Sequence, residues 1–228
     1  NKCEFSFGDS EKDGDLALGM RKRNSFYEVV TLKDCNIVDN DFLKIINTTL
    51  EFFTENNIPF YHKKRHDGQL RHLVVRAAFT GEILINLITT SYYTFSPDEY
   101  AKAILDTELS GKIAGILHTI NDSLADVVQS DETKILYGND YFYENLLGLK
   151  FKISAFSFFQ TNSKGAEKLY SVVREYAGDT SGKVVFDLYC GTGTIGQIMS
   201  EGSKKVIGIE IVEEAVEAAK INAELNGI

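Results

Sequence analysis

The sequence predicts an α/β fold in which an α+β region, residues 1–150, precedes the beginning of a doubly wound parallel sheet, residues 151–228. Up to residue 150, short β-rich runs surround two amphipathic helical stretches. From residue 162 onward, a helix is followed by a strand, a glycine-rich turn, a helix, a second strand and a further helix. Because neighbouring parallel strands need a helical crossover, this second order of elements is typical of a Rossmann-like sheet.

The first region contains alternating or β-branched runs that predict strands. They lie at residues 3–8, 16–18, 26–30, 73–79, 83–88, 113–120 and 133–137. A helix is expected from residue 41 to residue 55, with Asp39 or Asn40 as its N-cap. A second helix is expected to begin at Ser96 and Pro97, because serine caps helices and proline is tolerated in the first turn.

The last region is expected to contain a helix over residues 162–177 and a buried strand over residues 184–188. After the glycine-rich turn we expect a helix to about residue 200, a strand over residues 205–209 and a helix over residues 212–226. Two strands leave the faces and an edge of such a sheet uncovered. We therefore expect further strands after Ile228 in a longer parent protein.

The composition limits the class of protein. Of 228 residues, 43% are hydrophobic and 25% are charged, which is typical of a globular chain and argues against disorder. The apolar runs are far shorter than the roughly 20 residues of a membrane span, and no leader is visible. Cysteines at positions 3, 35 and 190 exclude an even disulfide framework and predict a reducing, cytoplasmic location.

The net charge of −9 is unevenly distributed along the chain. Residues 1–80 carry 12 basic and 12 acidic side chains, so the acid excess falls in residues 81–228. Basic clusters at residues 21–23 and 63–66, together with Arg71 and Arg76, are candidate phosphate contacts. Ordinary solvated loops remain the alternative interpretation of each cluster.

The strongest motif is the run DLYCGTGTIG at residues 187–196. Gly191 and Gly193 let the backbone approach a ligand, and Glu210, 19 residues after Gly191, is placed to accept ribose hydroxyls. The spacing fits a dinucleotide as well as S-adenosylmethionine. The anion of Asp187 would repel a pyrophosphate and suits a cationic amino-acid moiety, so the sequence favours S-adenosylmethionine over a dinucleotide or a structural turn.

A second unusual run, SFFQTN, occupies residues 157–162 immediately before the expected helix. Exposed aromatic rings can stack on a flipped base, and amides can bind its edge. Alternatively, one phenylalanine is buried and Gln160 or Asn162 caps the helix. The pattern alone favours the capping interpretation.

Taken together, these motifs resemble the bacterial RNA uracil-5-methyltransferases of the RumA/TrmA family. The resemblance covers nearly the whole chain. The family patterns S-F-F-Q-x-N, A-E-K-L-Y, D-L-Y-C-G-T-G-T-I-G and N-A-x-x-N-G match residues 157–162, 166–170, 187–196 and 222–227. Residues 1–8 and 71–76 resemble the family segments R-N-K-x-E-F-S-F-G and R-H-L-x-x-R.

The resemblance implies methylation of uracil C5 in RNA with S-adenosylmethionine as donor, on a Rossmann-like methyltransferase domain preceded by an α+β central domain. It places Gln160, Tyr189 and Glu210 at cofactor-binding positions and Phe158 near the target base. With Asp187, Gly191 and Gly193, these complete the expected cofactor set. The expected RNA contacts are Phe158, Lys2, Arg21, Arg23, Arg71 and Arg76.

In the family, a cysteine thiolate attacks uracil C6 and a carboxylate removes the C5 proton. The resemblance places both groups beyond Ile228, so no catalytic residue is expected in this fragment, which also begins after the family's N-terminal barrel. Cys190 is expected to pack within the cofactor loop, and Cys3 to be inert. Cys35 lies where iron–sulfur members place the fourth ligand of a 4Fe-4S cluster; a buried structural cysteine is the alternative.

The F-S-F-G segment and the position of Cys35 favour ribosomal RNA (23S) over tRNA as the partner. Neither DNA nor a membrane is expected as a partner. Two other classes remain open from the residues themselves. One is a dinucleotide-binding oxidoreductase, and the other is a non-catalytic RNA-binding module.

Overall fold

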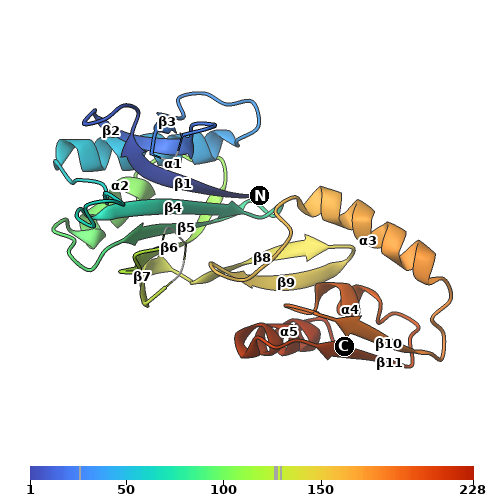
Figure 1. Ribbon diagram of the computed structural model, residues 1–228. Coiled ribbons are helices and arrows are strands. Elements are labelled where there is room, and N and C mark those ends of the chain that lie inside the picture. The colour runs from blue at the N-terminus through green and yellow to red at the C-terminus, as the bar shows by residue number, and fades with distance from the viewer. Residues whose placement is uncertain (26, 126–127, 129) are drawn as a thin grey trace. The chain divides into compact units, whose positions relative to one another are not determined.

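The computed structural model describes residues 1–25, 27–125, 128 and 130–228, and the chain forms two compact units (Figure 1). The larger unit contains Lys2–Ala77 and Gly81–Asp140. The smaller unit contains Asn1, Ala78–Thr80 and Tyr141–Ile228. No helix among the described residues has the length and apolar character needed to cross a membrane.

The larger unit is built on a seven-stranded sheet in the order β3-β2-β1-β4-β5-β6-β7. Its strands are β1 (Lys2–Asp9), β2 (Leu16–Arg21), β3 (Val29–Thr31), β4 (Leu70–Ala77), β5 (Glu82–Thr89), β6 (Lys112–Ile120) and β7 (Glu132–Gly138). Neighbours pair antiparallel except β5 and β6, which are parallel. The helix α2 (Pro97–Leu105) lies between β5 and β6 in the chain, as a parallel pair requires.

The helices α1 (Asn40–Glu55) and α2 pack against this sheet around an aromatic core. The ring of Phe53 lies 5.7 Å from Phe7, 4.9 Å from Phe95 and 5.3 Å from Tyr100. Such offset and edge-to-face contacts stabilise the core beyond the burial of area alone. The two helices therefore share one apolar layer with the sheet.

The local signals that predicted these helices are confirmed. The Asp39 side chain accepts a hydrogen bond from the Asp41 amide at 2.9 Å and caps α1. Ser96 accepts a hydrogen bond from the Glu99 amide at 3.3 Å and caps α2. The expected strands are also present, although the strand expected over residues 26–30 is Val29–Thr31; Phe26 lies outside the described residues.

The smaller unit begins with a hairpin that the sequence did not predict. Its strands β8 (Tyr141–Leu146) and β9 (Leu149–Ser154) pair antiparallel around a turn in which Leu147 and Gly148 have φ of 49° and 83°. Two left-handed residues are what a two-residue hairpin turn needs. The boundary expected at residue 150 therefore lies inside β9.

The rest of this unit follows the predicted order of elements. The helix α3 (Ser163–Ala177) precedes β10 (Val184–Leu188), α4 (Thr194–Ile198), β11 (Lys205–Ile209) and α5 (Glu213–Leu225). Strands β10 and β11 are parallel. The expectation that β10 is buried is wrong, because Phe186 and Leu188 are 60% and 59% exposed. In the described structure β10 pairs with β11 alone, so alternate side chains of β10 face solvent.

His118 on β6 offers a measurable pH dependence of stability. The ring is fully buried, its Nε2 lies 2.8 Å from Thr89 Oγ1, and Tyr93 and Phe95 flank it. Burial, with a smaller contribution from Lys134, lowers the pKa of His118 to about 4. The unfolded histidine titrates near 6.5, so the unfolded state binds the extra proton between these values.

The stability contributed by the neutral ring is present above pH 6.5 and is lost as the pH falls towards 4. We expect urea unfolding to give a free energy lower by about 2 kcal/mol at pH 5 than at pH 7 from this residue alone. His118→Gln should show a correspondingly smaller pH dependence. Equal pH dependence in the two proteins would contradict the assignment.

Candidate cofactor and RNA sites

The parallel pairing of β10 and β11 brings two carboxylates to one edge of the sheet. Asp187 lies opposite Gly208 in the register, and Glu210 follows directly after β11. The carboxyl ends of parallel strands are where open α/β sheets bind ligands. The structure thus brings Asp187 and Glu210, two of the residues expected to bind the cofactor, to the same edge of the sheet.

The loop between β10 and α4 adopts a backbone that favours glycine. Tyr189, Gly191 and Gly193 have φ of 63°, 52° and 77°. The Gly193 amide donates to the Cys190 carbonyl at 2.8 Å, which closes the turn. A Cβ on Gly191 would meet nothing within 4 Å, so a ligand can approach the backbone there. The ring of Tyr189 is 91% exposed beside this open space.

Glu210 holds this loop through backbone amides. Its carboxylate accepts hydrogen bonds from Gly191 at 3.0 Å, Ile211 at 2.8 Å and Val212 at 2.9 Å. These amides lower the pKa of Glu210 because they favour the charged form. A carboxylate has about four acceptor positions, so Glu210 keeps part of its capacity for a ligand hydroxyl.

The surroundings of Asp187 raise its pKa, whereas those of Glu210 lower the pKa of that residue. Its Oδ2 accepts a hydrogen bond from the Gly196 amide at 2.7 Å, and a Cβ on Gly196 would lie only 3.0 Å from that oxygen. Partial burial raises the pKa of Asp187, while the Gly196 hydrogen bond opposes the shift. The absence of a side chain at Gly196 is therefore what permits this contact.

Tyr170 of α3 joins the two sequence motifs in one place. Burial raises the pKa of Tyr170, Gln160 opposes the shift, and the charge of Asp187 adds to it. Tyr170 is therefore the residue whose pKa responds to both sequence motifs. Tyr170 was not assigned to the site from the sequence. Its position inside the A-E-K-L-Y pattern was the available signal.

The SFFQTN run combines both interpretations of its pattern. Phe159 is buried and packs 5.8 Å from Phe151, whereas Phe158 is 75% exposed. Asn162 accepts a hydrogen bond from the Gly165 amide at 2.9 Å and caps α3. One ring therefore anchors the segment, and the other is presented to solvent.

Asn222 of α5 is a second residue that sequence reasoning did not assign. Its buried side chain accepts a hydrogen bond from the Lys152 amide at 2.7 Å and donates to the Thr192 carbonyl at 3.5 Å. It therefore ties the glycine loop to the hairpin. The N-A-x-x-N-G pattern marked the residue but not this role.

Cys190 is held in the loop as a packed thiol. A Cβ on Gly208 would lie 2.8 Å from the Cys190 Sγ, so the two residues are in close contact. Burial raises the pKa of Cys190, and the nearby charges of Asp187 and Glu210 raise it further. A raised pKa disfavours the thiolate, so this environment does not suit a nucleophile.

Two of the expected RNA contacts, Arg71 and Arg76, are buried in the larger unit. Arg71 donates to the carbonyls of Asn121, Ser123 and Ala125 at 2.7–2.9 Å. Burial lowers the pKa of Arg76 to about 10, with Glu4 opposing the shift. Because a phosphate contact needs an accessible guanidinium, the structure gives these two residues a place in the fold and corrects the expectation that they face RNA.

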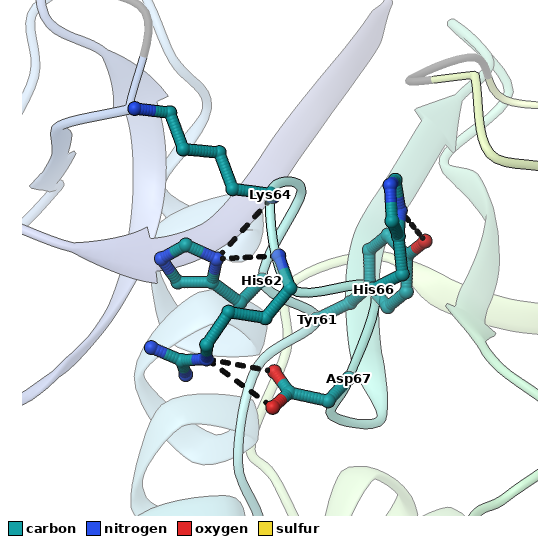
Figure 2. Close-up of polar contacts among 6 residues, drawn as sticks. Tyr61, His62, Lys64, His66 and Asp67 are labelled. Carbon is teal, nitrogen blue, oxygen red and sulfur yellow. Dashed lines mark hydrogen bonds and ion pairs between the residues drawn. The ribbon is translucent and has the colours of Figure 1, made fainter.

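The basic cluster at residues 63–66 lies in a tightly closed loop (Figure 2). The His62 amide donates to the Asp67 carbonyl at 2.6 Å, and His62 Nδ1 accepts from the Lys64 and Arg65 amides at 3.3 Å. Figure 2 shows Tyr61 and His66 facing each other, with the Tyr61 hydroxyl 3.0 Å from His66 Nδ1. Lys64 and Arg65 are exposed, so a defined backbone presents their charges to solvent.

The remaining basic candidates differ in exposure. Arg21 and Arg23 are exposed at and just after the end of β2. Lys2 is half-buried and forms an ion pair with Glu4 at 2.5 Å. Arg21 and Arg23 are therefore the more accessible of the three for a phosphate.

Cys35 is half-buried and lies close enough to Cys3 for its charge to contribute to the raised pKa of Cys3, after the larger effect of burial. Both thiols are free. In the described part of the chain, no group of three or more His, Cys, Asp or Glu side chains is arranged to hold a metal ion. The described residues therefore do not by themselves form an iron–sulfur site.

Comparison with known proteins agrees with this fold. A methyltransferase domain family model matches residues 179–228, which include the glycine loop. The structure of a tRNA (uracil-54, C5)-methyltransferase from Pyrococcus abyssi, in complex with S-adenosyl-L-homocysteine, matches all of this chain and 53% of that one. The TM-score is 0.79 at 27% identity. The chain thus has an α/β fold with a Rossmann-like methyltransferase segment.

Comparison with curated sequences shows a more specific similarity, to RNA methyltransferases. The chain is 56% identical to an uncharacterized RNA methyltransferase of Clostridium tetani over 229 residues, with 100% of this chain and 50% of that protein covered. It is 54% identical to another from Caldanaerobacter subterraneus subsp. tengcongensis, with 100% and 51% covered. The chain therefore spans about half the length of the curated relatives it matches.

An alanine side chain at Gly193 would be crowded by its neighbours as well as strained by the positive φ. We therefore predict that it destabilises the fold more than an alanine at a glycine with a positive φ and open space. A Cβ on Gly193 would lie 2.9 Å from Gln197 Nε2 and 3.0 Å from Ala219 Cβ, whereas Gly148, with φ of 83°, has nothing within 4 Å. We expect Gly148→Ala to cost about 1 kcal/mol and Gly193→Ala about 2–4 kcal/mol, measured by urea unfolding. Equal losses would show that the loop relaxes around the added methyl group.

Proposed function

We propose that this chain is the cofactor-holding and RNA-contacting part of an S-adenosylmethionine-dependent RNA uracil-C5 methyltransferase. One observation carries the proposal: Asp187 and Glu210, at the carboxyl ends of the parallel strands β10 and β11, accept hydrogen bonds from the Gly196 and Gly191 amides and so bracket the glycine loop. In this proposal residues 1–150 contact RNA, and residues 151–228 begin the methyltransferase domain. Similarity to named RNA methyltransferases over the whole chain supports it.

The side chains at the strand ends suit the parts of S-adenosylmethionine. The Glu210 carboxylate, fixed by three amides, is placed to accept ribose hydroxyls. The anion of Asp187, assisted by Gln160, suits the ammonium of the methionine moiety. Open space at Gly191 leaves room for the ligand against the backbone, beside Tyr189. When bound, S-adenosylmethionine supplies an electrophilic methyl group.

Uracil C5 is the proposed acceptor. The Pyrococcus abyssi neighbour is a uracil-C5 methyltransferase and matches the whole chain, and the SFFQTN run presents Phe158 for stacking on a base. The nucleophile that attacks C6 and the base that removes the C5 proton are not assigned to residues of this chain. Cys190, with its raised pKa, is not proposed for either step.

For the RNA itself, we propose ribosomal RNA, on the F-S-F-G segment and the position of Cys35. The neighbour from Pyrococcus abyssi acts on tRNA, so the two RNA classes must be compared directly. The exposed charges of Lys64, Arg65, Arg21 and Arg23 are suited to phosphates of either.

Calorimetric titration with S-adenosylhomocysteine tests the cofactor assignment, with NADH as the control ligand. We expect the folded chain to bind S-adenosylhomocysteine alone. Gly191→Ala should weaken binding at least tenfold, because the new methyl group enters the open space at the loop. Gly178→Ala is the matched control, with a similar positive φ and unchanged affinity. Binding of NADH alone would support an oxidoreductase instead.

The raised pKa of Asp187 predicts a pH dependence of binding. Protonation removes the anion that attracts the ammonium group, so the affinity for S-adenosylhomocysteine should fall as the pH is lowered from neutral towards this pKa. Asp187→Asn keeps an acceptor for the Gly196 amide but should bind roughly tenfold more weakly at pH 7. Its affinity should also vary less with pH, and an unchanged pH profile would contradict the assigned contact.

A further inference from the structure

One face of the β8–β9 hairpin carries a compact set of aromatic and cationic side chains. In the register, Tyr143 lies opposite Lys152, and Tyr141 and Lys150 occupy alternate positions on the same two strands. Alternate residues of a strand share a face, so these four side chains point the same way. The opposite face holds the buried residues Phe142, Glu144, Leu146, Phe151 and Ile153.

The four side chains are in mutual contact. The Lys150 ammonium lies 3.9 Å from the centre of the Tyr143 ring, and the Lys152 ammonium lies 3.9 Å from that of Tyr141. The two tyrosine rings meet edge to face at 5.4 Å. The charged side chains that the described strands β8 and β9 place on this face are the two lysines. We call this set, Tyr141, Tyr143, Lys150 and Lys152, the Tyr-Lys face.

The backbone beneath the Tyr-Lys face is held from two sides. The buried Glu144 carboxylate accepts hydrogen bonds from the Phe79 amide at 3.2 Å and the Ser163 hydroxyl at 2.8 Å. On the edge of β9 that does not pair with β8, Asn222 accepts a hydrogen bond from the Lys152 amide at 2.7 Å, and Asn226 accepts one from the Lys150 amide at 2.8 Å. The rings therefore project from a backbone whose position is fixed.

We infer that the Tyr-Lys face is a stacking platform for single-stranded RNA. Every base has a π-face that stacks on a tyrosine, and lysines beside such rings bind the phosphates between bases. Lys150 is exposed and Tyr141, Tyr143 and Lys152 are half-buried, so part of each side chain reaches solvent. Cation–π contacts that reach solvent are weak, so each lysine can leave its ring for a phosphate while a base takes its place. The inference rests on the proposed function for RNA as the partner.

Charge favours a polyanion at this place. Residues 81–228 have more acidic than basic side chains, and yet this face presents ammonium groups. A protein partner with an acidic surface would also meet the lysines, but it would not need two rings held edge to face for stacking. The experiment therefore separates the contribution of the rings from that of the charges.

The test is fluorescence anisotropy of a labelled, unstructured 12-nucleotide RNA with the whole 228-residue chain. Tyr141→Ala and Tyr143→Ala should each weaken binding about tenfold, whereas the phenylalanine variants should retain wild-type affinity because they keep the ring. Tyr176→Ala, at a side chain 87% exposed on α3, is the matched control. The double variant Lys150→Gln and Lys152→Gln should reduce the slope of log K against log salt by about 1.4.

Each outcome bears on the inference. Equal RNA affinity of wild type and both alanine variants, with melting temperature lowered, would overturn it and leave the contacts a purely structural role. S-adenosylhomocysteine affinity, measured for the same proteins, should not change. Loss of RNA binding in the alanine variants of a chain that does not bind S-adenosylhomocysteine would support the platform and reject the proposed function. If the chain binds S-adenosylhomocysteine and the alanine variants keep wild-type RNA affinity, the proposed function is supported and the platform is rejected.

Discussion

The buried amide of Asn222 is the contact on which the smaller unit depends. One side chain of α5 reaches both the Lys152 amide of β9 and the Thr192 carbonyl of the glycine loop. A buried amide left without these partners would incur the full cost of desolvation, so both segments are held where the amide needs them. The inferred RNA platform and the candidate cofactor loop therefore share one anchor, and a ligand that moves either segment acts on the same hydrogen bonds.

Two carboxylates at one sheet edge are made different by their surroundings. Glu210 is surrounded by amide donors and keeps its charge, whereas Asp187 is partly buried with one amide and has a raised pKa. Environments that separate the pKa values of neighbouring groups are typical of functional sites. Here the separation follows from the backbone: the left-handed loop directs the Gly191 amide to Glu210, and Gly196 lacks the side chain that would crowd Asp187.

Sequence reasoning correctly predicted features that depend on neighbouring residues. It failed where the placement of a side chain depends on residues far away in the sequence. Helix caps at Asp39 and Ser96, and the order of elements around the glycine loop, depend on neighbouring residues and were predicted correctly. Arg71 looked like a surface cation, because nothing near it in sequence reveals the carbonyls of residues 121–125 that surround it. The β8–β9 hairpin was missed although its strands alternate, because its turn, Leu147-Gly148, lacks the asparagine or aspartate that usually marks such turns.

The distribution of cations bears on how an acidic chain would bind RNA in the proposed function. Some basic side chains that face solvent lie beside acids, as Arg65 lies beside Asp67, and the field of such a pair is small at long range. Contacts of this kind position a backbone but carry no preference for unpaired bases. Aromatic rings do prefer unpaired bases, because they can stack on them. The closed loop at residues 61–67 presents charged side chains, whereas the β8–β9 hairpin presents tyrosines together with lysines. The proposed function requires both, because a base that is modified must be held outside a helix while its phosphates are bound.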